Sequence, residues 1–415
     1  METKHPAPVI VSPYRNLGVE DRLAAGKAAL CGFAALFAGI GLARFGYAPF
    51  VPALVHARWF TPEQADYLGA ANLMGYVFGL LFARRLASLV PVVFLLRAAM
   101  VVVGLHFLAC SSPVSFGWFF VWRLGAGIAG GVLMVLAAPA AIALSHAVLR
   151  GVAGGVVFTG LGLGTALSGI VVPALLRVGL STTWRSLSGM VFLLTFCCWK
   201  EFRCLSFTGV SNGPCSDRTV AEEPELEWNQ VWLLIATYSA TAIGFVAHTV
   251  FWVDFIARGL GLGITAGGHY WTILGLSAAC GPFLAGVVAD RTGFRKALRW
   301  SLLVNAIGVA TPLISTRGWA LGLSSVATGS IAFGIVPLAA GRAMELVSHS
   351  RRQQLWAWMT AAFSVAYAGN AYLFSFLLSR TGSFQLIFTI GAAVLLVGYG
   401  LDTFAHSKFH LNRPW

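Results

Sequence analysis

The chain has 415 residues, of which 58% are hydrophobic and 10% are charged. A soluble domain carries roughly 25% charged residues, so this composition excludes a soluble globular protein and is typical of a polytopic membrane protein. The formal net charge of +13 does not by itself indicate a nucleic-acid partner, because its distribution along the chain fits membrane orientation better.

The first 22 residues are polar and contain proline. They show no short apolar core followed by a small-residue cleavage site. The first hydrophobic segment is long enough to span a bilayer, so we expect it to be retained in the mature protein.

A membrane-spanning helix needs about 20 mostly apolar residues. Twelve segments of the chain fit this requirement: 28–54, 65–82, 91–110, 114–140, 152–175, 184–199, 231–257, 268–289, 297–315, 318–341, 355–379 and 383–404.

A polar stretch rich in Pro, Gly, Ser and acidic residues separates the sixth segment from the seventh. The pattern predicts an all-α integral membrane protein with twelve transmembrane helices in two pseudo-symmetric six-helix bundles. The predicted organisation is a cytoplasmic tail (1–27), an N-terminal bundle (28–199), a cytoplasmic linker (200–229), a C-terminal bundle (230–404) and a cytoplasmic tail (405–415).

The Lys and Arg residues are unevenly divided between the two sides of this layout. With the N-terminus in the cytoplasm, six of the 28 fall in outer loops and three within spans, which leaves 19 for the inner loops and tails. Basic residues concentrate on the cytoplasmic side of membrane proteins. The sequence therefore predicts that both termini are cytoplasmic and that the protein lies in the cytoplasmic membrane.

The two halves of the chain resemble each other at a nearly constant offset. "AGIGLARF" in the first segment matches "TAIGFVAH" in the seventh, and "GYVFGLLFARR" matches "GPFLAGVVADR" after the second and eighth segments. "RVG" after the fifth segment matches "RTG" after the eleventh. Ordered matches of this kind indicate an internal repeat, which many transporter folds have.

Arginine is costly in hydrocarbon, and three arginines fall within the predicted spans. Arg44 lies about 16 residues into the first segment and Arg123 about ten residues into the fourth, which runs the other way, so their predicted depths are similar. Arg97 lies near the start of the third segment and can extend to the interface. We interpret Arg97 as structural. Arg44 and Arg123 should point away from lipid, either into a cavity or to a buried partner.

The sequence "GPFLAGVVADRTGFRKAL" follows the pattern G-x-x-x-D-R-x-G-x-R-K at the end of the eighth segment. Glycine permits a tight turn there, and the acid can cap a neighbouring helix or bind a basic side chain. An ordinary positive-inside loop is the alternative interpretation. The motif residues are Gly286, Asp290, Arg291, Gly293 and Arg295.

This motif, the six-plus-six layout and the repeat resemble the major facilitator superfamily. Within it, "GLARFGYAPFVPAL", "HTVFWVDFIARGLG", "HYWTILGLSAACGP" and "MTAAFSVAYAGNAYLFSFLLSRTGSFQ" are similar to the YbfB/YjiJ-like branch. The resemblance implies an alternating-access transporter with its substrate site between two bundles. The chain departs from the superfamily between the second and third segments, where "LFARRLASLV" lacks the acidic residue of the corresponding motif.

The resemblance also implies that the first and seventh segments face the central cavity. His248 stands one position from the repeat equivalent of Arg44 and could titrate near neutral pH, or it could be a hydrogen-bonded core histidine. Asp254 lies near the outer end of the seventh segment, where it could couple protons or pair with Arg44 to close an outer gate. No carboxylate falls at mid-depth.

Other cavity candidates are aromatic or amide side chains in the spans, because a buried amide needs partners and interfacial aromatics are common. They are Tyr47, Asn72, Trp252, Tyr270, Trp271, Trp356, Tyr367 and Asn370.

The leading hypothesis is a secondary active transporter for a small organic solute, anionic because two intramembrane arginines lack a mid-depth acid. Proton-coupled drug efflux is a second hypothesis, and a membrane sensor on the same fold is a third. An enzyme is not expected, because no nucleophile, acid–base pair or metal-spaced set appears. We expect a monomer without a cofactor or metal, whose partners are the bilayer, the substrate and a proton or other coupling ion. The seven cysteines are interpreted as free thiols.

Overall fold

The computed structural model describes residues 19–144, 150–206, 228–347 and 351–411. Helices make up nearly all of this part of the chain, which confirms the all-α fold class. The long helices are α1 (Val19–Leu36), α3 (Pro62–Leu89), α4 (Val92–Ala109), α5 (Phe116–Ala143), α6 (Arg150–Leu176), α7 (Leu180–Cys198), α8 (Trp228–Asp254), α9 (Gly263–Thr292), α10 (Phe294–Ile314), α11 (Gly318–Leu346), α12 (Arg352–Thr381) and α13 (Phe384–Leu411).

Ten helical segments of the described chain are long and apolar enough to cross a membrane. The protein is therefore an integral membrane protein. Helices α3 and α7 are not among the ten, although both cover segments that the sequence predicted to span. The reason is compositional. Helix α3 carries two acids in its first turns and two arginines near its end, and α7 begins with the polar run "STTWRS".

The first predicted span is not one continuous helix. After α1 the chain forms a π-helical turn, η1 (Phe37–Leu42), then a short 3-10 helix, η2 (Phe45–Tyr47), and finally α2 (Phe50–His56). The interruption lies within "GIGLARFGYAP", where glycine lowers helix propensity and proline has no N–H to donate. Arg44 lies at this break, between η1 and η2.

Close helix contacts within the first half depend on glycine. A Cβ atom on Gly127 of α5 would lie 2.1 Å from the carbonyl oxygen of Asn72, and one on Gly75 of α3 would lie 2.1 Å from that of Leu124. Only glycine permits backbones to approach so closely. Not every glycine of α5 makes such a contact, because Gly125 faces open space.

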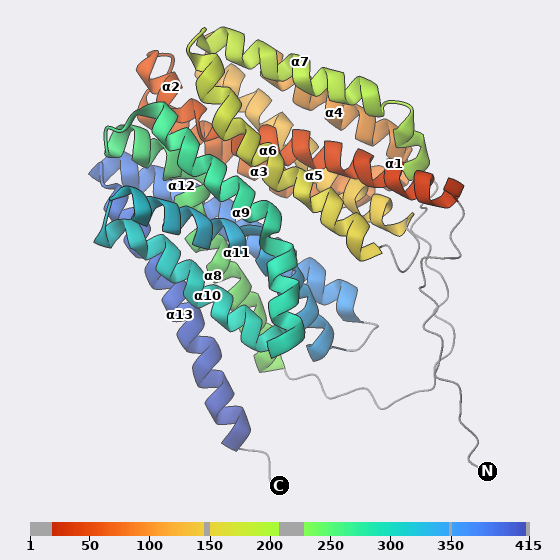
Figure 1. Cartoon of the computed structure of the whole chain (residues 1–415), viewed down its shortest axis with the longest axis vertical. Coiled ribbons are helices and arrows are strands. Elements are labelled where there is room, and N and C mark those ends of the chain that lie inside the picture. Colours follow the sequence, from red (N-terminus) through yellow and green to blue (C-terminus); the bar gives the residue numbers. More distant parts are fainter. Residues whose placement is uncertain (1–18, 145–149, 207–227, 348–350, 412–415) are drawn as a thin grey trace, which may run out of the picture.

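Helices of the first half of the chain lie in the upper part of Figure 1 and those of the second half in the lower part. Two helix pairs join them, α3 with α12 and α6 with α9. Glycine brings α6 and α9 together, because a Cβ on Gly275 would lie 2.3 Å from the main-chain nitrogen of Ala166. At one end of the molecule α2 also contacts α8. This end of the molecule contains α2, the start of α3 and the end of α8. We call it the α2 end.

The G-x-x-x-D-R-x-G-x-R-K motif forms the tight turn that the sequence predicted between α9 and α10. Helix α9 ends at Thr292, α10 begins at Phe294, and Gly293 between them has φ 83°. A side chain would be strained in this conformation, so the motif requires glycine there. The expected capping or pairing by Asp290 is not found. Its side chain is exposed, and it makes no hydrogen bond or ion pair within the described residues.

Candidate functional site

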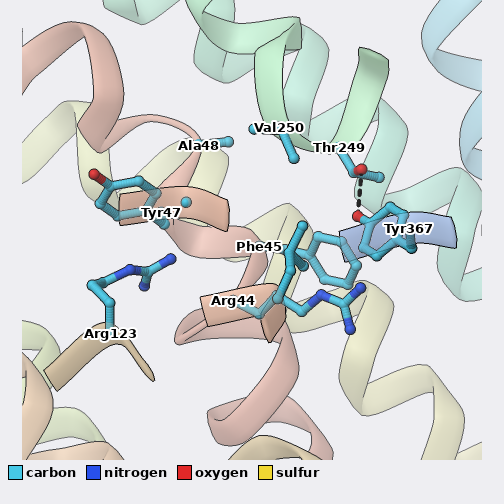
Figure 2. Close-up of a pocket in the computed structure, with 10 residues that line it drawn as sticks. Arg44, Phe45, Tyr47, Ala48, Arg123, Thr249, Val250 and Tyr367 are labelled. Carbon is cyan, nitrogen blue, oxygen red and sulfur yellow. Dashed lines mark hydrogen bonds between the residues drawn. The ribbon is translucent and has the colours of Figure 1, made fainter. Parts of the chain in front are cut away.

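A small cavity lies at the junction of the two halves, where the interrupted first span meets α3, α5, α8 and α12 (Figure 2). Its volume of about 20 Å³ suffices for a water molecule but not for an organic solute. The halves would therefore have to separate before a solute could enter. The lining residues are Arg44, Phe45, Tyr47, Ala48, Gly69, Leu73, Arg123, Thr249, Val250 and Tyr367.

The guanidinium group of Arg44 is surrounded by aromatic rings from both halves of the chain. Its Cζ atom lies 4.4 Å from the ring centre of Tyr76 on α3, 4.7 Å from that of Tyr367 on α12 and 5.0 Å from that of Phe45. Figure 2 shows the Arg44 side chain extending toward the ring of Tyr367. Aromatic faces attract a cation but do not neutralise it.

Arg44 has no anionic partner in the described part of the chain. No carboxylate oxygen lies within 4.0 Å of its guanidinium nitrogens among these residues, and its buried Nε atom has no hydrogen-bond partner there. Arg44 is half-buried, and a cation that is partly shielded from water without a counter-ion is unfavourable. The cavity therefore offers a positive charge that an anion would stabilise.

Arg123 lines the same cavity, but its guanidinium is committed to backbone partners. Nη1 donates to the carbonyl oxygen of Ala43 at 2.7 Å, and Nε donates to that of Leu68 at 3.2 Å. The group also lies 3.9 Å from the ring centre of Tyr47, and the whole residue is 1% exposed. The break after η1 leaves the Ala43 carbonyl without a helical N–H donor, so Arg123 replaces that donor from α5. This geometry indicates a structural crosslink between three segments.

The second half of the chain contributes hydroxyl groups to the cavity wall. The hydroxyls of Thr249 on α8 and Tyr367 on α12 lie 2.5 Å apart, as the dashed line in Figure 2 marks. Thr249 also donates to the carbonyl oxygen of Phe245 at 2.7 Å. Because the threonine proton is used there, Tyr367 is the donor to Thr249. These hydroxyls place hydrogen-bonding capacity opposite the positive charge of Arg44.

His248 and Trp252 do not line the cavity. His248 is fully buried, its Nε2 atom lies 2.7 Å from the hydroxyl of Ser324 on α11, and its ring stacks on Trp252 at 4.3 Å. The indole N–H of Trp252 donates to the hydroxyl of Ser325 at 3.0 Å. Of the two interpretations of His248, this environment favours a hydrogen-bonded core histidine.

Asp254 does not pair with Arg44, contrary to the proposed gate pair. Its carboxylate binds Arg258, one helical turn further on, through Nε and Nη2 of the guanidinium. The α-helix passes directly into the π-helical turn η5 (Phe255–Gly259) at this point, which brings the two side chains together. A nearer arginine with bidentate geometry satisfies the carboxylate.

The amide and remaining aromatic candidates serve mainly as links between helices. Asn72 donates to the carbonyl oxygen of Arg123 at 3.0 Å, and Asn370 donates to that of Ile243 at 3.2 Å. The indole of Trp271 on α9 donates to Ser168 on α6 at 3.1 Å, which joins the two halves. Tyr270 lies near Gly318 at the start of α11, and Trp356 lies 6.2 Å from Tyr238. None of these five lines the cavity.

The motif residue Arg295 lies near the C-terminal helix rather than near the cavity. Its Nε atom is 4.0 Å from the carboxylate of Asp402, which also accepts a 2.7 Å hydrogen bond from Arg299. Gly286 faces open space and Arg291 is exposed. Within the described residues, the motif thus contributes a turn and a link between α10 and α13.

Sequence reasoning missed Tyr76 and Thr249. A helical pattern could have indicated Tyr76, because Gly69, Leu73 and Tyr76 follow each other at spacings of four and three residues and so share one face of α3. Thr249 directly follows His248, and the sequence alone gave no reason to prefer one over the other. The free thiols expected at the cysteines are found at the six that the structure describes, and Cys215 lies outside the described residues.

A family model described as "Uncharacterised MFS-type transporter YbfB" matches residues 36–403. None of the curated proteins matches the chain.

Solved structures of transporters share its fold. The chain is similar to a bacterial homolog of the human lysosomal transporter Spinster in an inward-facing and unoccupied conformation, with 13% identity, a TM-score of 0.69 and coverage of 96% of this chain and 99% of that one. It is also similar to a D-xylose-proton symporter, with 16% identity, a TM-score of 0.70 and coverage of 92% and 97%. At these identities the likeness concerns the fold.

Proposed function

The chain belongs to the YbfB family of major facilitator superfamily transporters, and from that premise we propose that it moves a small organic anion across the membrane by alternating access. This is a family of transporters, not of enzymes, so a small-molecule substrate follows from membership. The observation that supports an anionic substrate is the environment of Arg44 on the cavity wall. Three aromatic rings surround its guanidinium group, and no carboxylate of the described residues lies within 4.0 Å of it.

The proposed architecture is twelve spans in two six-helix bundles, 28–199 and 230–404, joined by a cytoplasmic linker at 200–229. Helices α3 and α7 would complete the twelve. Their polar ends can lie at the interfaces, and the glycine contacts of α3 with α5 shield its polar face from lipid. The positive-inside bias supports cytoplasmic termini in the cytoplasmic membrane. The α2 end would then face outward.

Alternating access would use the cavity as the meeting point of the two bundles. Tyr76 belongs to the first bundle and Tyr367 to the second, and both rings contact the Arg44 guanidinium. When the bundles separate, Arg44 loses one ring and gains access to a solute. A carboxylate could then accept two parallel N–H bonds from Arg44, while the Tyr367 and Thr249 hydroxyls bind its polar substituents. Substrate binding would thus replace cation–π contacts with a stronger ion pair.

The test is a thermal-shift screen of the purified protein with benzoate, lactate, succinate, D-xylose and tetraphenylphosphonium as probes. A ligand that binds only the folded state raises the melting temperature. We expect at least one carboxylate to stabilise the wild type and to lose its effect in Arg44→Gln. Arg317→Gln serves as a matched control, because Arg317 is exposed and lies away from the cavity. Stabilisation by the cation or the sugar alone, or by a carboxylate in Arg44→Gln, would contradict the proposal.

A further inference from the structure

Three ionisable side chains from the two halves of the chain gather at the α2 end. Asp66 lies in the first turns of α3, Asp254 is the last residue of α8, and Arg258 lies in η5. Asp66 is 1% exposed and Asp254 is fully buried.

Packing between α3 and α8 places the carboxylates of Asp66 and Asp254 at the same end of the helix pair. A Cβ atom on Gly69 would lie 3.6 Å from Cγ1 of Val250, so the two helices touch there. Asp66 precedes Gly69 by about one turn and Asp254 follows Val250 by about one turn. The helices run in opposite directions, so both carboxylates lie on the α2 side of this contact. Their electrostatic interaction, and that of Asp66 with Arg258, agree with this placement.

The cluster holds two carboxylates but one guanidinium. Both oxygens of Asp254 bind Arg258. Asp66 has no cation within 4.0 Å in the described residues, and its buried Oδ1 atom has no hydrogen-bond partner there. If both acids were ionised, one buried negative charge would remain uncompensated, which is strongly unfavourable.

The neighbouring groups do not supply the missing positive charge. On its own helix Asp66 interacts with the acid Glu63. Tyr47 of η2 donates its hydroxyl proton to the carbonyl oxygen of Ala65, and the ring of Tyr372 on α12 stacks on Tyr67 next to Asp66. These phenols are neutral, so only a bound cation or a proton can balance Asp66.

We propose that Asp66 is the binding site of a coupling proton and that its protonation closes the α2 end of the transporter. This inference rests on the alternating-access function proposed above, but it concerns the coupling ion and not the substrate. In the closed state the Asp66 carboxyl carries the proton. When the end opens and water enters, the O–H bond breaks, the proton passes to water, and the electron pair stays on the carboxylate. Proton return restores the neutral acid and permits closure.

A proton suits this site better than a metal cation. Hard cations surround themselves with six or more oxygen ligands. Here the Asp254 oxygens are occupied by Arg258, and the described residues contain no group of three or more potential metal ligands. A single buried carboxyl therefore fits one proton.

Infrared spectroscopy of the purified protein tests the protonation directly and needs no substrate. We expect a carboxylic-acid C=O band at neutral pH that disappears in Asp66→Asn and persists in Glu63→Gln. Glu63 is the matched control, an exposed acid one turn away on the same helix. A band that survives in Asp66→Asn would overturn the assignment to Asp66.

A distance measurement tests the coupling to closure. Spin labels at His56→Cys and Leu262→Cys, in a background without the native cysteines, report separation across the α2 end, because both sites are exposed. If opening releases one proton, the open-to-closed ratio rises about tenfold per pH unit while the closed state predominates. Asp66→Asn should stay closed at every pH, whereas Glu63→Gln should keep the pH response. A pH response retained in Asp66→Asn, or closure driven by sodium at constant pH, would refute the proposal. A failed anion screen would leave both readouts unaffected.

Discussion

Arg123 donates a 2.7 Å hydrogen bond from Nη1 to the carbonyl oxygen of Ala43, the residue directly before Arg44. One intramembrane arginine therefore holds the broken backbone from which the other extends. The two arginines that the sequence grouped together thus have different environments. The guanidinium of Arg123 has two carbonyl acceptors, whereas that of Arg44 has aromatic neighbours.

Replacing Arg123 should reduce stability. Arg123→Met keeps much of the side-chain volume but removes hydrogen bonds to two buried carbonyl groups. Hydrogen bonds to charged groups contribute about 1.5–3 kcal/mol each, and the gain from not burying a charge offsets part of this loss. We expect a net loss of roughly 2–4 kcal/mol, measured as a lower melting temperature in detergent. Arg317→Met, at an exposed position, should leave the melting temperature unchanged. Equal melting temperatures for Arg123→Met and wild type would argue against a structural crosslink.

Replacing Arg44 should weaken anion binding without lowering the stability of the fold. Arg44→Gln removes cation–π contacts worth about 0.5–2 kcal/mol each and also removes the cost of keeping a half-buried charge without a counter-ion. We expect the melting temperature to change little while anion affinity falls roughly 10- to 100-fold. Isothermal calorimetry with the carboxylate found in the screen measures the affinity. A large loss of stability with unchanged affinity would instead assign Arg44 a structural role.

His248 should contribute to stability and not to binding. Ser324 donates its hydroxyl proton to the carbonyl oxygen of Gly308 at 2.6 Å, so it can only accept from His248 Nε2–H. A double-mutant cycle with His248→Ala and Ser324→Ala should give a coupling free energy of about 1 kcal/mol. Anion affinity of His248→Gln should match wild type. Reduced affinity in a variant that retains its melting temperature would return His248 to the list of binding residues.

Gly275 should control how closely the two halves approach. In Gly275→Ala the new Cβ would lie 2.3 Å from the main-chain nitrogen of Ala166, so α9 would have to move away from α6. We expect the spin-label distance between positions 56 and 262 to broaden toward the open state. Gly155→Ala is the matched control, because nothing lies within 4 Å of a Cβ at Gly155 on α6. An unchanged distance distribution in Gly275→Ala would show that this contact does not limit opening.

The sequence was sufficient to predict the family and the class of fold. Apolar segments of spanning length and the turn motif around Gly293 are local patterns, because each depends on one helix or one turn. The match over residues 36–403 confirms the family. A single helix covers most of each predicted segment except the first, which α1, η1, η2 and α2 cover in succession. The number of spans and their grouping into two bundles stay predictions.

Local sequence patterns did not reveal which groups the buried polar side chains contact. Sequence position placed Arg44, Arg123 and His248 at comparable predicted depths. A helix turns by about 100° per residue, however, so a shift of one position decides which neighbour a side chain meets. Thr249 therefore faces the cavity while His248 next to it faces Ser324.

Composition and the length of the apolar segments thus determined that this chain is a helical membrane protein, because lipid imposes the same requirement on every span. The family motifs added that it is a transporter. Only the tertiary structure decided that Arg123 is hydrogen-bonded to Ala43 and Leu68 and that Arg44 and Asp66 are without ion-pair partners in the described chain. The physical reason is that a charge buried between helices is stabilised by groups far away in the sequence. Whether it finds such a group depends on how the helices pack.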